Sequence, residues 1–411
     1  MKNSYLILAT VCSLFITTST APYLGISLGG TFAYGLFFLL FSYNILISDK
    51  RLYSKKFRIE YAIILIFFVY SFFQYFVSGW NVIQSAFFFV LVPMLISITV
   101  RLQSIKTKSN IVKVILVFFF IECALAIIEK ILQKNVFPML VDGLNPFLNV
   151  EDWQFRSTAL LGHPLNNALC TSTILGFIIV GKFSTWFKAV SIALGFMAIL
   201  AFNARGATII MGLVILYYLY MIVKKGYKSP DKRFIFLLLF GLLIIGAFNI
   251  ISDTSFGGRI YNDKTLIDGS ALTRLRVLGA FDYLNGRDLW IGNPSLYLPI
   301  THKLGAAGIE NSFVVIILNF GLLFGIPLII GLILFVLKRL GTYSLKQKIL
   351  LISSFLLVGS TNNGLSTLYP WVVFLLCANC FSYINIKSFS TQPIKKKGCL
   401  IKSTKHTYSV A

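Results

Sequence analysis

Three arginines and one glutamate in this sequence have the residue types and positions to do chemistry: Arg156, Arg205, Arg274 and Glu310. All four fall in or next to loops on one side of a series of long apolar segments. A guanidinium group grips a diphosphate through two parallel hydrogen bonds and neutralises it as a magnesium ion would. A carboxylate can accept the proton of an attacking hydroxyl group. These side chains therefore suit an anionic, lipid-linked substrate that carries a diphosphate.

The first motif runs from Arg156 through Gly162-His163-Pro164 to Asn167. Glycine and proline break the helix that the apolar residues around them would form, and a broken helix leaves free backbone N–H groups that bind anions. His163 is the one histidine beside a membrane motif, so it could contact substrate or simply cap the broken helix. The alternative is a proline-kinked helix with Arg156 reaching to the membrane interface.

Two shorter motifs lie further along the chain. Arg205 sits in a tight outer turn, residues 203–207, where basic residues are unusual in membrane proteins, so we expect it to have an anionic partner. Lipid phosphate and substrate phosphate both remain open for that partner. Glu310 and Asn311 lie at the mouth of a later apolar segment. Glu310 could act there as a base, and capping of the helix by either residue is the alternative.

The segment around Arg274 has a regular apolar pattern. An apolar residue recurs at every third position, as on one helix face: Leu272, Leu275, Leu278 and Phe281. On an α-helix, Arg274 and Arg276 would point about 200° apart. At most one of them can therefore contact the same phosphate, and we assign Arg274.

Two acidic residues lie inside an apolar segment. Glu122 and Glu129 are seven residues apart and so share one helix face, which should point into the bundle. Pairing with Lys130 or with another bundle residue is the interpretation that we favour over a catalytic role.

The elements that position these residues follow from composition. Hydrophobic residues make up 57% of the 411 residues and charged residues only 12%, against about 25% in soluble proteins. Such a chain needs lipid as its solvent. We predict a single all-α integral membrane domain, residues 1–411, with twelve spans: Ser4–Thr20, Gly29–Ile47, Ile59–Ser78, Ile83–Val100, Val112–Leu132, Ala159–Val180, Trp186–Phe202, Ala207–Val223, Phe234–Ile251, Ser312–Leu337, Ile349–Leu365 and Tyr369–Ile386.

The distribution of charge sets the topology. The chain carries 37 basic and 14 acidic residues, and most of the basic ones fall in alternate loops, which is typical of cytoplasmic loops rather than of a nucleic-acid-binding surface. Both termini are then cytoplasmic, with a basic tail over residues 387–411. Two loops on the opposite side are long, residues 133–157 and the large late loop 252–309, and loops of that size are commonly functional. The sequence shows no metal-ligand spacing and no nucleotide-binding motif, so we expect neither a metal nor a cofactor.

In this order, the motifs resemble those of the O-antigen ligase and polymerase superfamily of bacterial inner membranes. The likeness covers residues 156 to 325 and includes Arg274 with Gly292 eighteen residues later, and Gly321 with Gly325 after Glu310. The first 150 residues match only as apolar helices. The resemblance implies a fold like that of C-type membrane glycosyltransferases, with about twelve spans and one large late periplasmic loop. It also implies metal-independent glycosyl transfer from an undecaprenyl-diphosphate-linked oligosaccharide, with a chain-length regulator and a flippase as partners.

The resemblance suggests a role for each residue of the motifs. Glu310 becomes the catalytic base, and the other six residues bind substrate: Arg156, Arg205, Arg274, His163, Asn167 and Asn311. Ligases of this superfamily usually have His-Asn where this chain has Glu310-Asn311, and that departure favours a polymerase over a ligase. A flippase or other transporter is a third interpretation. Charges on one face and the lack of an internal repeat favour an enzyme.

Overall fold

In the computed structural model, the described part of the chain is helical and contains no strand. It comprises residues 2–17, 19–25, 35, 37, 39, 41–43, 50–78, 87–138, 154–225, 241, 276–305 and 308–390. The α-helices are α1 (Lys2–Phe15), α3 (Arg58–Ser78), α5 (Val92–Arg101), α6 (Ile105–Leu132), α7 (Pro164–Val180), α8 (Thr185–Ala201), α9 (Arg205–Lys225), α13 (Gly286–Ile291), α14 (Tyr297–Lys303), α15 (Ser312–Arg339), α16 (Leu345–Ile352), α17 (Val358–Ser360) and α18 (Leu368–Ser390). Short 3₁₀ helices cover Pro22–Leu24, Lys50–Tyr53, Lys55–Phe57, Val277–Tyr283, Pro294–Leu296 and Gly364–Ser366, and π-helical turns cover Phe87–Leu91 and Ser353–Leu357.

Four helical stretches are long and apolar enough to cross a membrane: Lys55–Phe76, Ile105–Leu132, Arg205–Ile222 and Ser312–Arg339. The outer face of α3 is a row of exposed aromatic rings, in which Phe68, Phe72 and Phe76 are 57%, 63% and 72% exposed. Rings on a helix surface this open need lipid around them. The composition, the long apolar helices and this exposed face together give an all-α membrane protein.

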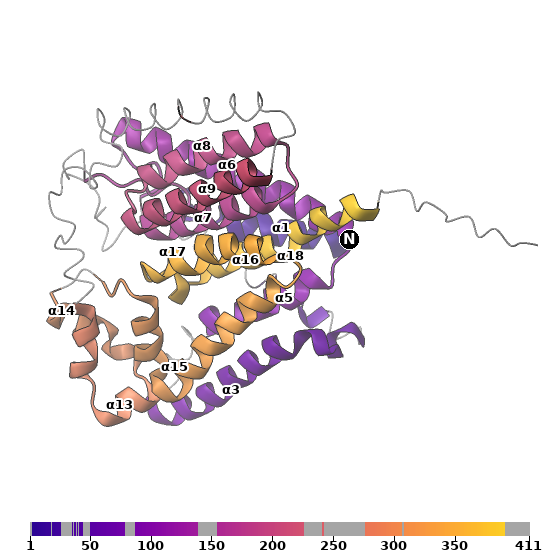
Figure 1. Cartoon of the computed structure of the whole chain (residues 1–411). Helices are drawn as coiled ribbons and strands as arrows, with labels where there is room; N and C mark the ends of the chain where they lie inside the picture. The colour runs from indigo at the N-terminus through magenta and orange to yellow at the C-terminus, as the bar shows by residue number, and fades with distance from the viewer. Residues whose placement is uncertain are drawn as a thin grey trace, which may run out of the picture.

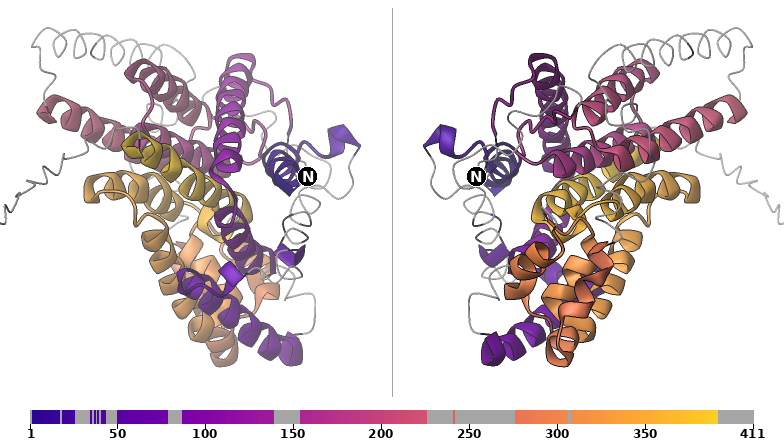
Figure 2. Two further views of the ribbon diagram at one scale, coloured as in Figure 1. Left: turned by 90° about the vertical axis from the view of Figure 1, so that its right-hand side faces the viewer. Right: turned by 90° about the vertical axis from the view of Figure 1, so that its left-hand side faces the viewer.

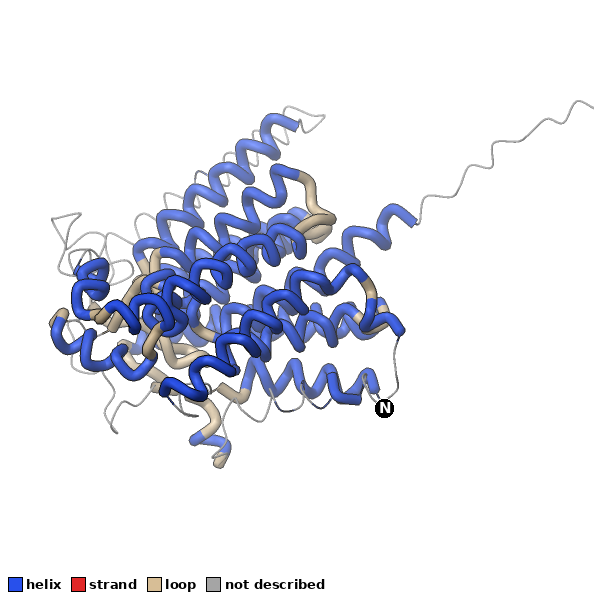
Figure 3. The backbone as a smooth tube through the Cα atoms, turned by 90° about the horizontal axis from the view of Figure 1, so that it is seen from below, coloured by secondary structure: helices blue, strands red, loops and turns tan. Residues whose placement is uncertain are grey.

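The helices pack around α18. This helix contacts α5, α6 and α7, while α6, α7, α8 and α9 form one side of the bundle and α3 with α15 the other (Figure 1). Residues of α18 from Trp371 to Phe381 are almost all buried, and Phe374 stacks on Phe355 with ring centroids 4.3 Å apart. A helix that is apolar and buried on all sides belongs at the centre of a bundle. The start of α1 and the end of α18 lie at the same end of the bundle (Figure 1 and Figure 3).

A second, smaller core lies beside the main one. It contains Val277, Ala280, Ile300 and Ile309, packed against Val314, Val315 and Leu318 on the first turns of α15. In both views of Figure 2 this orange part of the chain lies next to α3. The later part of α15, from Phe320 onward, packs in the main core instead. The α15 helix therefore connects the two cores, and it bends at Gly321, whose φ of +68° is not helical.

Four predicted spans coincide with the helices that are long enough to cross a membrane: Ile59–Ser78, Val112–Leu132, Ala207–Val223 and Ser312–Leu337. Five others overlap shorter apolar helices: Ser4–Thr20, Ile83–Val100, Ala159–Val180, Trp186–Phe202 and Tyr369–Ile386. The spans Gly29–Ile47 and Phe234–Ile251 lie largely outside the described residues. The span predicted from Ala159 becomes helical only at Pro164, because residues 156–163 are held in an irregular conformation described below. The span predicted over Ile349–Leu365 is broken into α16, a π turn, α17 and a loop.

Candidate functional site

The irregular segment 157–160 is held by the two buried glutamates of α6. The Glu129 side chain accepts hydrogen bonds from the Thr158 and Ala159 backbone N–H groups at 2.8 and 2.9 Å, and from the Ser157 hydroxyl. The Glu122 side chain accepts one from the Leu160 N–H at 3.1 Å. The sequence predicts pairing of these glutamates with Lys130 or with another bundle residue; the hydrogen-bond partners among the described residues are the Ser157 hydroxyl and otherwise backbone N–H groups. The two carboxyl groups thus replace the helical hydrogen bonds that this segment lacks.

The ends of the same segment are fixed by further side chains. Lys130 donates from Nζ to the Phe155 carbonyl at 2.9 Å, and Asn135 donates from Nδ2 to the Arg156 carbonyl at 3.0 Å. The fully buried Asn167, expected to bind substrate, donates to the Thr158 carbonyl. Asn167 therefore positions the segment that leads from the half-buried Arg156 to His163.

His163 is the N-cap residue of α7, but its side chain makes no capping hydrogen bond. Its Nδ1 atom is buried and has no hydrogen-bond partner among the described residues. The Glu310 carboxylate is near enough to the His163 ring to interact with it electrostatically. The histidine of the first motif and the glutamate of the last one therefore lie in the same region of the structure, although their positions differ by 147 in the sequence.

The Arg205 turn lies against this segment. The Ser157 N–H donates to the Ala201 carbonyl at 3.1 Å, directly before the turn. Asn203 adopts a left-handed conformation with φ of +55°, which asparagine tolerates better than most residues. Arg205 is the first residue of α9 and is half-buried. The turn therefore places a guanidinium group at the same end of the bundle as Arg156 and His163.

The start of α15 completes this end of the bundle. Asn311 caps the helix, because its Oδ1 accepts from the N–H groups of Phe313 and Val314 at 3.0 and 3.2 Å. Capping was an alternative for both residues, and Asn311 takes that role. Glu310, one residue earlier, is half-buried. The buried Ser312 hydroxyl donates to the Asn362 carbonyl at 2.8 Å and ties the helix start to the loop before α18.

That loop, residues 361–367, is the part of the site that the sequence analysis missed. A side chain at Gly206 would collide with Thr361, so this loop lies against the Arg205 turn. The Thr367 hydroxyl donates to Asn166 Oδ1 at 3.2 Å, so it also contacts the His163 motif. The run Asn362-Asn363-Gly364 inside a predicted span was the signal that could have found it. These residues add neutral hydrogen-bonding groups to a site otherwise defined by charge.

The segment around Arg274 is only partly described. Arg274 itself lies outside the described residues, and Arg276 is exposed. The expected apolar face is wrong at Leu278, which is 54% exposed, whereas Val277 and Ala280 are buried. Residues 277–283 form a 3₁₀ helix, in which every third side chain aligns, and the fully buried row is Val277 with Ala280, next to the predicted row.

Two glycines of the later motifs meet directly. A Cβ atom on Gly292 would lie 2.5 Å from the Asn319 carbonyl oxygen and the Gly321 nitrogen, and both glycines have positive φ. The Asn293 N–H donates to the Leu318 carbonyl at 2.8 Å, and Gln74 Nε2 donates to the Gly292 carbonyl at 3.1 Å. Only glycine permits two backbones to approach this closely in these conformations. The pair therefore has a structural role: it joins the segment 276–305 to the bend in α15.

In the part of the chain that the structure describes, no group of three or more His, Cys, Asp or Glu side chains could hold a metal ion. No model of a known protein family matches the sequence, and a comparison with curated proteins finds no match. What the site can do must therefore be argued from its own residues. It combines guanidinium groups, a carboxylate, an imidazole and neutral amide and hydroxyl groups at one end of a membrane bundle.

Proposed function

We propose that this protein is a bacterial surface-polysaccharide polymerase of the inner membrane, which joins undecaprenyl-diphosphate-linked repeat units at the periplasmic face. One observation carries the proposal. Four segments far apart in the sequence, which contain Arg156 with His163, Arg205, Glu310 and the loop 361–367, meet at one end of a helical membrane bundle. Cations, a carboxylate and neutral polar groups are what a glycan on a lipid diphosphate requires.

The proposed reaction is a single displacement. Glu310 accepts the proton of the acceptor sugar hydroxyl, and that oxygen attacks the anomeric carbon of the donor sugar with inversion. The bond between that carbon and the diphosphate oxygen breaks, and undecaprenyl diphosphate leaves with the bonding electrons. Arg205, Arg156 and Arg274 stabilise the departing charge, which makes a metal ion unnecessary. Because Asn311 caps α15, the neighbouring carboxylate does not have to serve as the cap.

The wider arrangement belongs to the same proposal. Twelve spans, cytoplasmic termini and periplasmic loops at 133–157 and 252–309 would place the site at the outer face of the membrane. An O-antigen ligase, which transfers the finished glycan to lipid A-core, needs the same groups and is the second candidate. A flippase is disfavoured, because transporters place their polar groups near the membrane midplane, whereas Arg205 and Glu310 lie at helix starts.

The test is complementation of a deletion strain, with the surface glycan separated on a gel. Loss of a polymerase leaves single repeat units on lipid A-core, whereas loss of a ligase leaves none. We expect Arg205→Ala and Glu310→Gln to reproduce the deletion phenotype at normal membrane levels. Arg205→Lys should restore polymer only partly, because a lysine ammonium group cannot make the two parallel hydrogen bonds of a guanidinium group. Two lost charge-assisted bonds of roughly 1.5–3 kcal/mol each predict about a 100- to 10,000-fold slowing.

Two comparisons sharpen the test. Arg276→Ala removes an exposed arginine of the same segment and should be milder than Arg274→Ala. Glu310→His introduces the residue usual in the superfamily and should retain some activity, unlike Glu310→Gln. Near-normal polymer from Glu310→Gln would end the proposal of a general base, and a full ladder from the deletion strain would end the proposed function.

A further inference from the structure

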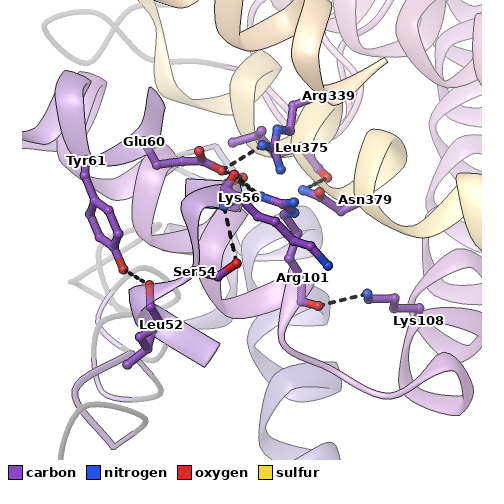
Figure 4. Close-up of polar contacts among 11 residues, drawn as sticks. Leu52, Ser54, Lys56, Glu60, Tyr61, Arg101, Lys108, Arg339, Leu375 and Asn379 are labelled. Atoms are coloured by element: carbon purple, nitrogen blue, oxygen red, sulfur yellow. Dashed lines mark hydrogen bonds and ion pairs between the residues drawn. The ribbon is translucent and has the colours of Figure 1, made fainter. Parts of the chain in front are cut away.

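The α3 helix has the length of one membrane crossing. Near its start, the fully buried Glu60 accepts through Oε1 from Arg339 Nη2 at 3.1 Å and from Arg101 Nη1 at 3.2 Å (Figure 4). The apolar stretch ends at Phe76, 18 positions after the exposed Arg58. At 1.5 Å per residue this is about 27 Å, close to the roughly 30 Å of the hydrocarbon core of a bilayer. Phe76 therefore lies near one boundary of that core.

The short helix α13 is joined by hydrogen bonds to this end of α3. Gln74 Nε2 donates to the Ile291 carbonyl at 3.0 Å and to the Gly292 carbonyl at 3.1 Å, where α13 ends. Gln74 precedes Phe76 by two positions, which is about 3 Å along the helix axis. The layer of lipid headgroups on each side of a bilayer is about 5–8 Å deep. These bonds therefore place the end of α13 at the depth of this layer, beside α3 at the edge of the bundle (Figure 1).

One face of α13 combines an aromatic ring with a cation. Trp290, directly before Ile291, is 58% exposed, and the exposed Arg287 lies three residues earlier, on the same side of the helix. The neighbouring Asp288 faces Asn293, whose Nδ2 donates to its Oδ1 at 3.2 Å. An indole ring has an apolar body and one polar N–H group, so it is favoured where hydrocarbon meets the headgroups. A guanidinium group extends from that level to lipid phosphate.

The lipid-facing surface of α3 leads to the same level. Its exposed rings, Phe68, Phe72 and Phe76, extend to the depth at which Gln74 holds α13. The lipid that surrounds these rings therefore also reaches the level of Trp290. A bilayer is the partner whose chemistry fits both side chains of this face, because it offers hydrocarbon to the ring and phosphate to Arg287.

We propose that Trp290 and Arg287 anchor α13 to the membrane surface, with the indole ring between the headgroups and the upper acyl chains and the guanidinium group on a lipid phosphate. The anchor fixes the depth of the small core, because α13 packs on α15. This inference does not depend on the proposed glycan chemistry.

The experiment uses the full-length protein in vesicles of phosphatidylglycerol and phosphatidylcholine, and compares the tryptophan fluorescence of the wild type with that of Trp290→Phe. The difference between the two signals is the emission of Trp290, since the other tryptophans are common to both proteins. We expect most of this emission to be lost when the lipids carry bromine on acyl-chain carbons near the headgroup, and to persist in aqueous acrylamide. Trp371→Phe is the matched control: Trp371 is 1% exposed, so its emission should persist with both quenchers.

A loss of Trp290 emission in acrylamide that exceeds the loss in brominated lipid would overturn the proposal, because the ring would then face water. Persistence with both quenchers would overturn it too, because protein would then cover the ring. Arg287→Gln should make Trp290 more accessible to acrylamide, whereas Arg276→Gln, which removes another exposed arginine of the segment 276–305, should not. Equal effects of these two changes would overturn the contact with lipid phosphate. The altered side chains of α13 are exposed, so these variants should fold, and a monodisperse elution profile checks this.

Discussion

The two buried glutamates of α6 should respond very differently to the same substitution. Glu129 uses both oxygens: Oε2 accepts from Ser157, Thr158 and Ala159, and Oε1 accepts from the Val136 N–H at 2.7 Å. Glutamine has only one acceptor oxygen. In Glu129→Gln the amide NH₂ group therefore takes the place of one carboxylate oxygen and faces an N–H donor with which it cannot form a hydrogen bond. Glu122 accepts one hydrogen bond, from Leu160, which a glutamine oxygen can preserve.

The magnitudes follow from these bonds. With the glutamine oxygen directed at the three donors of residues 157–159, the Val136 N–H is left without its partner, at a cost of about 1–3 kcal/mol. The other three bonds lose the assistance of a full charge, about 1 kcal/mol each. Glu129→Gln should therefore lower the free energy of unfolding by roughly 4–6 kcal/mol and Glu122→Gln by about 1 kcal/mol.

Denaturant titration of the purified variants in mixed micelles, followed by tryptophan fluorescence, measures the difference. Glu122→Gln is the matched control, since it makes the same chemical change seven residues away on the same face of α6. Equal destabilisation of the two variants, or a loss below about 1 kcal/mol for Glu129→Gln, would refute the claim that Glu129 holds the segment before α7.

Two further outcomes are expected. Gly321→Ala should prevent normal folding, because its Cβ would enter the backbone at residues 290–292, whereas Gly212→Ala has open space around it and should express normally; comparable membrane levels would contradict this. Reporter fusions should read cytoplasmic at Lys346 and periplasmic at Asp263, and a cytoplasmic reading at Asp263 would overturn the topology.

The sequence predicts the helices better than it predicts the site. Apolar length alone indicates α6 and α15, and the break at Pro164 follows from residue type. The role of Glu129 could not be predicted, because its partners are mainly backbone groups, which leave no trace in side-chain spacing. The contact between Thr367 and Asn166 joins residues 201 apart, and no local pattern encodes it. The expected face at Leu278 was wrong because spacing by three shows which residues align but not which aligned row faces the core, and the buried row is Val277 with Ala280.

The bend at Gly321 divides α15 into two mechanical parts. The part before it packs on the segment 276–305 through Val315 and through the contact of Gly292 with Asn319, and the part after it packs in the main core. Glu310 directly precedes the first part, whereas Arg205 begins α9, which packs in the main core. The distance between Glu310 and Arg205 therefore depends on the bend at Gly321 and on the hydrogen bond from Ser312 to Asn362. A displacement of the segment 276–305 would move Glu310 more than Arg205.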